Sequence, residues 1–116
     1  MAYSLFNVSG KTALITGSSR GIGFALAQGL GQAGVRLLIN GTNKDTLEVA
    51  VSRLKSEGFD AYAVPFDVTD KEQIEKQLQY VEEHIGPIDI LVNNAGIQKR
   101  APLEEFSLSD WEALID

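Results

Sequence analysis

One stretch constrains the fold of this chain more than any other, the sequence T-G-S-S-R-G-I-G from Thr16 to Gly23. An apolar run over residues 12–15 precedes it, and a run over residues 21–33 with apolar side chains at helical spacing follows it. The stretch therefore predicts a tight turn between a strand and a helix. The first N–H groups of such a helix have no partner inside it, and the helix dipole favours negative charge beside them. A pyrophosphate group meets both conditions, so the turn predicts an anion-binding site.

Each glycine of this turn has its own predicted purpose. Gly17 permits the sharp turn, Gly21 lets the backbone approach a ligand, and Gly23 lets the helix pack close to the sheet. Glycines also mark many ordinary turns, so the spacing alone is compatible with a purely structural connection. If the turn binds a dinucleotide, the candidate residues are Gly17, Ser18, Ser19, Arg20, Gly21, Ile22 and Gly23.

The rest of the chain alternates short apolar runs with amphipathic runs at a spacing of roughly 25 residues, which is typical of a parallel sheet with helices on both faces. The sequence predicts strands at 12–16, 35–40, 61–66 and 88–92, and helices at 21–33, 44–57, 70–85 and from Ser107 onward. This pattern predicts an α/β, Rossmann-type doubly wound sheet of strand order 3-2-1-4. Helical spacing assigns the buried face of the first helix to Ile22, Ala25, Leu26, Gly29, Leu30 and Ala33.

In such a sheet the strand order reverses between the first and fourth strands, and ligands bind beyond the carboxyl ends of the strands at that reversal. The glycine turn follows the first strand, and the loop that begins at Asn93 follows the fourth. Both are expected to flank one crevice. Small side chains in this loop allow a cofactor to come close, although an ordinary turn has the same composition. The candidates here are Asn93, Asn94, Ala95 and Gly96.

The end of the second strand predicts which nicotinamide cofactor binds. Sites for NAD usually have an acidic residue there, roughly 20 residues beyond the glycine turn, that bonds the ribose 2′-hydroxyl. Here the segment reads Asn40-Gly41-Thr42 and is neutral. Arg20 can supply positive charge and Thr42 a hydroxyl group to a 2′-phosphate, which favours NADP over NAD. Replacement of Gly41 by aspartate is expected to reverse this preference. The alternative is that Arg20 is a solvated loop side chain.

A carboxylate follows the third strand. Asp67 can accept a hydrogen bond from the adenine amino group, and the backbone of Val68 can bond the edge of the ring. On spacing alone, Asp67 is equally compatible with a turn or cap aspartate beside Thr69, which we expect to cap the third helix.

Composition excludes several other functions. The net charge of −6 comes without any basic run, so binding to nucleic acid is not expected. There is no cysteine, hence no disulfide or thiolate metal site, and no metal site is predicted. No apolar stretch reaches membrane-spanning length and residues 1–10 do not resemble a signal peptide, so a cytoplasmic protein without membrane contact is expected. Residues 1–116 are expected to belong to a single domain.

Three motifs together resemble the short-chain dehydrogenase/reductase family: the glycine turn, Asp67-Val68 and the Asn93–Gly96 loop, in this order and spacing. The segment 88–98, followed by Arg100, residues 102–106 and Trp111, is most similar to the gluconate 5-dehydrogenases of that family. The resemblance implies reversible reduction of 5-keto-D-gluconate to D-gluconate with a nicotinamide cofactor. It also implies that NADP(H) contacts Ser18, Ser19, Arg20, Gly21, Thr42, Asp67, Val68 and Asn94.

Two further expectations concern the substrate and the assembly. Arg100 is expected to bind the carboxylate of the sugar acid, since it lies just past the Asn93–Gly96 loop where substrate would meet nicotinamide; a solvated loop charge is the alternative. Trp111, Leu114 and Ile115 are expected to be core or subunit interface, and the full-length protein is expected to be a homo-oligomer.

The sequence departs from the family in length. Family members run to about twice this length, and their catalytic serine, Tyr-x-x-x-Lys pair and fourth-helix asparagine lie beyond the point where this sequence ends. None of Tyr3, Tyr62 and Tyr80 is followed by lysine four residues later. The chain is therefore expected to be the cofactor-binding half, with no catalytic residue among its 116. The alternatives are a 3-ketoacyl-thioester reductase of the same family and a truncated module that binds NADP or a subunit without turnover.

Overall fold

The computed structural model describes residues 8–95, which form a four-stranded parallel sheet and three helices. The strands lie in the order β3-β2-β1-β4. Their bounds are β1 (Thr12–Ile15), β2 (Arg36–Gly41), β3 (Ala61–Pro65) and β4 (Ile90–Val92), and the helices are α1 (Gly21–Gln32), α2 (Lys44–Ser56) and α3 (Lys71–His84). The predicted fold class and strand order are confirmed. β4 begins two residues later than predicted, and the predicted helix after Ser107 lies outside the described residues.

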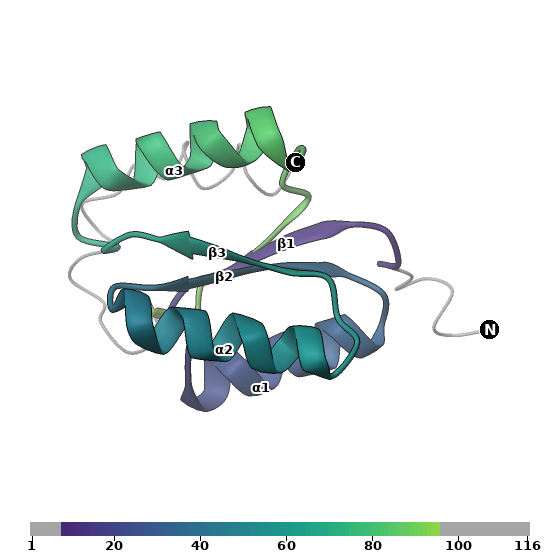
Figure 1. Cartoon of the computed structure of the whole chain (residues 1–116). Helices are drawn as coiled ribbons and strands as arrows, with labels where there is room; N and C mark the ends of the chain where they lie inside the picture. Colours follow the sequence, from purple (N-terminus) through teal and green to yellow (C-terminus); the bar gives the residue numbers. More distant parts are fainter. Residues whose placement is uncertain (1–7, 96–116) are drawn as a thin grey trace.

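Side chains that alternate along the strands divide the core into two layers. Ala13, Leu37 and Ile39 pack with α1 and α2, whereas Leu14, Leu38 and Val64 pack with Ile74 and Val81 of α3. Figure 1 shows α1 and α2 below the sheet and α3 above it. Both faces of β1 and β2 are therefore covered, which explains their unbroken apolar sequences.

The predicted buried face of α1 is wrong. Gly23, Phe24 and Ala27 face the sheet, whereas the side chains of Ile22 and Leu26 are 67% and 40% exposed. Leu30 is half-buried against the core; the other members of the predicted face, Ala25, Gly29 and Ala33, are exposed. The physical reason is the close approach of the helix to the sheet. A Cβ on Gly23 would lie 2.5 Å from the carbonyl oxygen of Gly17, so only glycine fits on the side of α1 that meets the turn.

Polar contacts at the amino ends of the strands stabilise the edge of the sheet opposite the glycine turn. Arg36 forms an ion pair with Asp60 (Nε to Oδ2 3.0 Å) and donates from Nη1 to the carbonyl oxygen of Ile85 (3.0 Å). A hydrogen bond to the carboxylate of Asp60 raises the pKa of Tyr62 above its usual value, and burial of the ring adds to the shift. These contacts connect β2, β3 and the end of α3.

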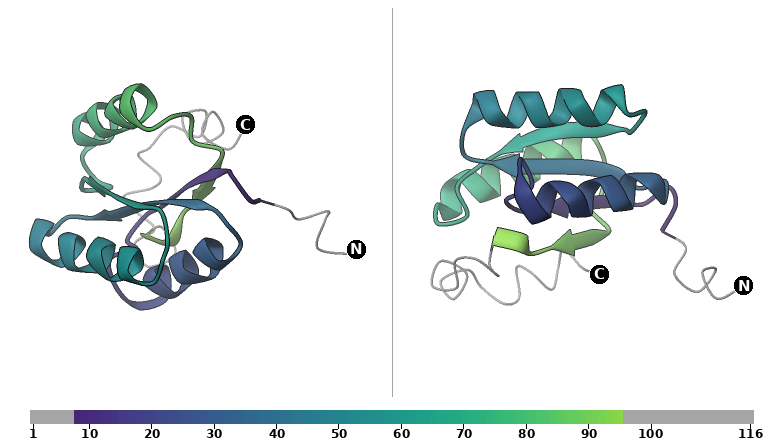
Figure 2. Two further views of the ribbon diagram at one scale, coloured as in Figure 1. Left: turned by 45° about the vertical axis from the view of Figure 1, so that its right-hand side comes forward. Right: turned by 90° about the horizontal axis from the view of Figure 1, so that it is seen from below.

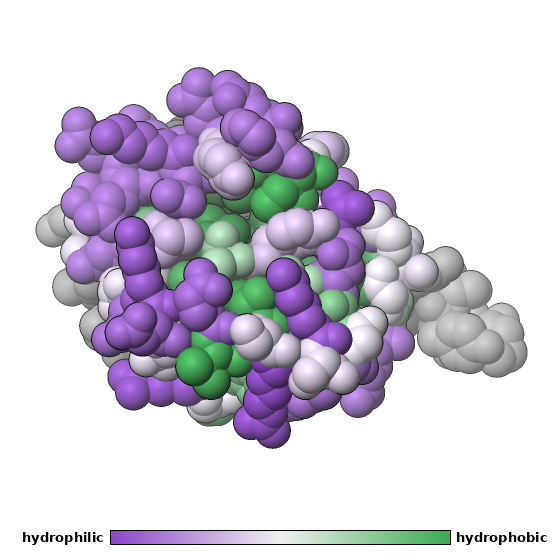
Figure 3. Space-filling view, in the orientation of Figure 1, coloured by the Kyte–Doolittle hydropathy of each residue, from purple (hydrophilic) through white to green (hydrophobic). Residues whose placement is uncertain are grey.

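A groove of about 500 Å³ lies between α2 and α3, and residues of the edge strand β3 form its floor. Hydrophilic side chains predominate over both helices, and hydrophobic surface shows in the band between them and also over the lower side of α2 (Figure 3), a helix on which Val49 is exposed. Lys44, Lys76 and the strand residue Pro65 line the groove. Proline in an edge strand, and lysines of the neighbouring helices beside that edge, oppose the addition of another strand. β4 is at the other side of the sheet and, within residues 8–95, pairs only with β1 (Figure 2).

Candidate functional site: a hollow at the carboxyl ends of the strands

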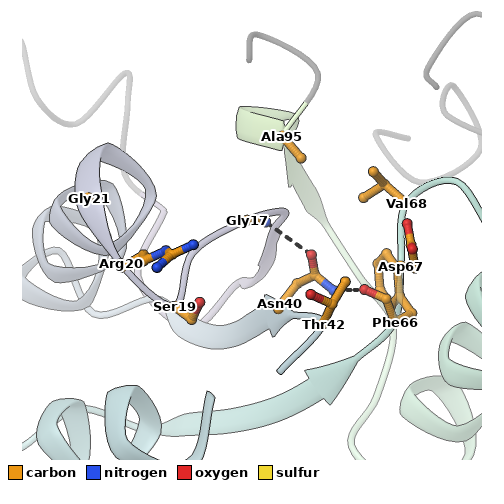
Figure 4. A pocket seen from close by; sticks show the side chains of 11 residues that line it. Gly17, Ser19, Arg20, Gly21, Asn40, Thr42, Phe66, Asp67, Val68 and Ala95 are labelled. Carbon is orange, nitrogen blue, oxygen red and sulfur yellow. Dashed lines mark hydrogen bonds between the residues drawn. The ribbon is translucent and has the colours of Figure 1, made fainter. Parts of the chain in front are cut away.

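A hollow of about 410 Å³ opens where β1, β2 and β3 end and where the chain continues beyond β4. Figure 4 shows the glycine turn with Arg20 on one side of the hollow, Asn40 and Thr42 in the middle, and Asp67 and Val68 on the far side. Four segments far apart in the sequence meet here, as the strand order requires. The lining residues are Gly17, Ser19, Arg20, Gly21, Asn40, Gly41, Thr42, Phe66, Asp67, Val68 and Ala95.

The amino end of α1 faces this hollow without a capping side chain. The N-cap residue Arg20 makes no side-chain cap hydrogen bond, and the first turn contains no acidic residue. The other two helices in residues 8–95 are capped, α2 by Asn43 and α3 by Asp70 rather than by the predicted Thr69. The N–H groups in the first turn of α1 are therefore available to an anionic ligand.

The backbone of the turn leaves room for such a ligand. Gly21 has φ +65°, a left-handed conformation that favours glycine, and a Cβ built on it would meet nothing within 4 Å. That empty volume adjoins the hollow that Gly21 lines. Free N–H donors and open space are what a pyrophosphate requires, and binding of one at this turn stays a prediction.

Two buried polar side chains fix the turn against β2. Asn40, which is 2% exposed, accepts from the Gly17 N–H (2.9 Å) and donates to the carbonyl oxygens of Val64 and Phe66 (3.1 Å each). Ser18 donates to the carbonyl oxygen of Ile15 (2.6 Å) and accepts from the Asn40 N–H (2.9 Å). Asn40 thus connects the glycine turn to the end of β3, and the two walls of the hollow share one side chain.

The segment after β4 is fixed to the same turn. The buried side chain of Asn94 donates to the carbonyl oxygen of Gly17 (3.0 Å), and the Ala95 N–H donates to Oγ1 of Thr16 (3.0 Å). The Thr16 N–H in turn donates to the carbonyl oxygen of Val92 (3.0 Å). Asn94 therefore stabilises the turn, while Ala95 lines the hollow.

The part of the hollow beside the end of β2 carries positive charge and hydroxyl groups. Arg20 is exposed, extends toward the hollow in Figure 4, and forms no ion pair with any residue of the described chain. Thr42 and Ser19 also line this part, and Gly41 contributes no side chain. No carboxylate stands at the end of β2, where a site for NAD usually has one.

Asp67 lines the far wall and also forms a turn. Its Oδ1 accepts from the N–H (2.9 Å) and the hydroxyl group (2.7 Å) of Thr69, and its own N–H donates to Gln73 (3.0 Å). The two interpretations of this residue are therefore compatible: hydrogen bonds within the loop hold the Asp67 carboxylate in place at the wall of the hollow.

The structure brings most of the predicted residues to one place, but in two groups. Eight line the hollow: Gly17, Ser19, Arg20, Gly21, Thr42, Asp67, Val68 and Ala95. Ser18, Gly23 and Asn94 lie behind it as buried supports, Asn93 is half-buried, and Ile22 is exposed at the start of α1. Gly96 and Arg100 lie outside the described residues. Asn40 and Phe66 also line the hollow and were not predicted from the sequence, although both lie at the carboxyl end of a buried strand; Gly41, which lines it too, was predicted only as the position where an acidic residue is absent.

Two other kinds of site find no support among the described residues. Within residues 8–95 no group of three or more histidine, cysteine, aspartate or glutamate residues is placed to hold a metal ion. In the same part of the chain, no helix is long and apolar enough to cross a membrane.

Comparison with known proteins identifies the family. Residues 11–116 match the short chain dehydrogenase family. The 5-keto-D-gluconate 5-reductase of Escherichia coli K12 is 50% identical over 111 residues, covering 96% of this chain and 44% of that protein. The gluconate 5-dehydrogenase of Gluconobacter oxydans is also 50% identical over 111 residues, covering 96% of this chain and 43% of the relative. A gluconate 5-dehydrogenase from Burkholderia cenocepacia, solved in complex with NADP and tartrate, is 46% identical with a TM-score of 0.78 over 99% of this chain and 45% of that one.

The chain belongs to the short-chain dehydrogenase family, since the family match covers residues 11–116. It spans less than half the length of these curated relatives.

Proposed function

We propose that residues 1–116 form the cofactor-binding half of an NADP(H)-dependent sugar-acid oxidoreductase that interconverts 5-keto-D-gluconate and D-gluconate. The observation that carries the proposal is the uncapped amino end of α1 beside a hollow with an arginine and no carboxylate at the end of β2. The gluconate-oxidising relatives at 50% identity support the substrate, and the relative solved with NADP supports the cofactor.

In this proposal each wall of the hollow binds one part of the cofactor. The N–H groups that begin α1 bind the pyrophosphate, Arg20 and Thr42 bind the 2′-phosphate, and Asp67 with Val68 binds the adenine ring. When bound, NADPH supplies the hydride that reduces a ketone to an alcohol. The residues described here bind and orient the cofactor, and none of them is assigned a proton-transfer role.

The preference for NADP(H) follows from charge. Charge-assisted hydrogen bonds from Arg20 to a 2′-phosphate are worth on the order of 1.5–3 kcal/mol, or roughly tenfold or more in affinity. Titration of the full-length protein with NADPH and NADH, followed by nicotinamide fluorescence, tests this. Tighter binding of NADPH and loss of most of that advantage in Arg20→Ala are expected. Lys55→Ala removes a positive charge from the exposed side of α2, outside the residues that line the hollow, and as the control it is expected to bind both cofactors as the wild type does. Equal affinities in the wild type would contradict the proposal.

The substrate is tested by NADPH oxidation with 5-keto-D-gluconate in the full-length protein. A higher kcat/KM for a 3-ketoacyl thioester than for the sugar acid would favour the ketoacyl reductase alternative. Cofactor binding without turnover of either compound would favour a non-catalytic module. A homo-oligomer and a cytoplasmic location are further parts of the proposal, tested by light scattering and by cell fractionation.

A further inference from the structure

Gly41 ends β2, and the space around it, not its backbone conformation, favours glycine at this position. Gly41 pairs in register with Pro65 of β3 and is absent from the glycines with positive φ, so its backbone is open to any L-residue. A Cβ built on Gly41 would nevertheless lie 3.0 Å from Oγ and 3.2 Å from Cβ of Ser19. The side chain of Ser19 therefore occupies the volume into which a side chain at position 41 would extend.

Ser19 has little freedom to move out of that volume. Its neighbour Ser18 is held by three hydrogen bonds: the Ser18 N–H donates to the Asn40 carbonyl oxygen, the Ser18 hydroxyl group donates to Ile15, and the Asn40 N–H donates to that hydroxyl group. Oγ of Ser19 can rotate, but its Cβ moves only with the backbone of the turn. A Cβ at position 41 is therefore closer to Ser19 than an ordinary van der Waals contact, and either the turn or the end of β2 has to shift by a few tenths of an ångström to admit it.

We propose that Ser19 and Gly41 form a reciprocal pair that determines cofactor specificity. Ser19 fills the position in which a site for NAD places its acidic side chain, and it presents a hydroxyl group beside Arg20 and Thr42, where the 2′-phosphate would lie. The inference rests on the proposed dinucleotide binding at this hollow. It changes the expectation for Gly41→Asp: this substitution alone weakens NADP binding without strengthening NAD binding, and a smaller residue at position 19 is needed as well.

The test combines substitutions at the two positions in the full-length protein and measures Kd for NADPH and NADH by fluorescence titration. Gly41→Asp alone is expected to weaken NADPH binding at least roughly tenfold and to leave NADH binding no tighter than in the wild type. In the Gly41→Asp background, NADH affinity is expected to rise in steps with Ser19→Ala and then Ser19→Gly, by roughly tenfold overall. Alanine removes only the 3.0 Å contact, whereas glycine also removes the 3.2 Å contact.

A second measurement separates the steric pair from cofactor binding. Without cofactor, Gly41→Ala is expected to lower the Tm, and Ser19→Gly is expected to restore most of that loss in the double variant. If the wild type binds neither dinucleotide, the proposed function fails, while the unfolding measurements still test the contact. The pair is overturned if Gly41→Asp alone binds NADH more tightly than the wild type, or if Gly41→Ala leaves the Tm unchanged.

Discussion

Asn40 is the residue on which the geometry of the hollow depends most directly. In Asn40→Asp, a carboxylate oxygen replaces the NH2 group and faces the carbonyl oxygens of Val64 and Phe66. Because two buried acceptors lose their donor, the free energy of unfolding is expected to fall by about 1–3 kcal/mol or more. Urea denaturation of the full-length protein measures this.

The same chemical change elsewhere serves as the control for Asn40. Asn43→Asp alters the N-cap of α2, where the side-chain oxygen accepts from the Thr46 N–H at 3.0 Å and no donor role is needed. Asparagine and aspartate are equally good N-caps, so this variant is expected to unfold as the wild type does. Equal stability of the two variants would show that the Asn40 amide group has no structural importance.

Arg100 carries the prediction about substrate. We expect its guanidinium group to bind the carboxylate of the sugar acid, so Arg100→Ala should lower kcat/KM for 5-keto-D-gluconate roughly tenfold or more. The affinity for NADPH should stay unchanged, because the residue is assigned to the substrate alone. Steady-state kinetics and a cofactor titration on the same variant separate the two effects. An unchanged kcat/KM would assign Arg100 to the solvated loop.

Some residues of the site could be predicted from the chemistry of their side chains, whereas the roles of others depend on contacts that only the structure shows. Arg20, Thr42 and Asp67 carry charges or hydroxyl groups at strand ends and were selected for that reason. Asn40 was not selected, because its importance comes from hydrogen bonds to the Gly17 N–H and two carbonyl oxygens of other segments. The sequence singled out Gly41 only as the position where an acidic residue is absent, and its contact with Ser19 across the turn became visible only in the structure.

At the scale of elements, α1 allows a matched pair of glycine substitutions. Gly23→Ala would place a Cβ 2.5 Å from the Gly17 carbonyl oxygen and 2.7 Å from Nδ2 of Asn94, so the variant is expected to lose about 1–3 kcal/mol of stability. Gly29→Ala meets nothing within 4 Å in the same helix and should gain about 0.5–1 kcal/mol from helix propensity. Thermal unfolding of the two variants measures both. Effects of the same sign would contradict the packing described for α1.

The error in the buried face of α1 has a physical origin in the same residues. Ile22 and Leu26 satisfy a helical period and so predict a buried face, but a second face with Phe24 and Ala27 satisfies it as well. Hydrophobicity does not choose between two apolar faces. The choice is made by Gly23, whose missing side chain lets the helix approach the turn.

At the scale of the whole molecule, the strand order was predictable because each apolar run is bounded by turn residues and alternates with a helix. For β4 the structure describes a single partner, because within residues 8–95 this strand pairs only with β1. The three residues of β4, Ile90-Leu91-Val92, are apolar and include no lysine or proline. An apolar edge strand without a partner promotes association between chains.

Residues 1–116 expressed alone are therefore expected to self-associate and to oxidise no NADPH in the presence of 5-keto-D-gluconate. Light scattering measures the molecular mass, and absorbance follows the cofactor. The full-length protein, assayed in parallel, is the control for both measurements. A stable monomer, or turnover by the isolated segment, would show that residues 1–116 need no further partner strand or catalytic group.

The hydrogen bonds that fix the glycine turn also divide its amide protons into two classes. The N–H groups of Gly17 and Ser18 are bonded to Asn40, whereas those at the start of α1 have no protein partner within residues 8–95. Deuterium should therefore enter slowly at Gly17 and Ser18 with or without nucleotide, and at Gly21 and Ile22 it should slow only once nucleotide is bound. The turn would then be already rigid when its ligand arrives, so that association needs no prior ordering of this loop.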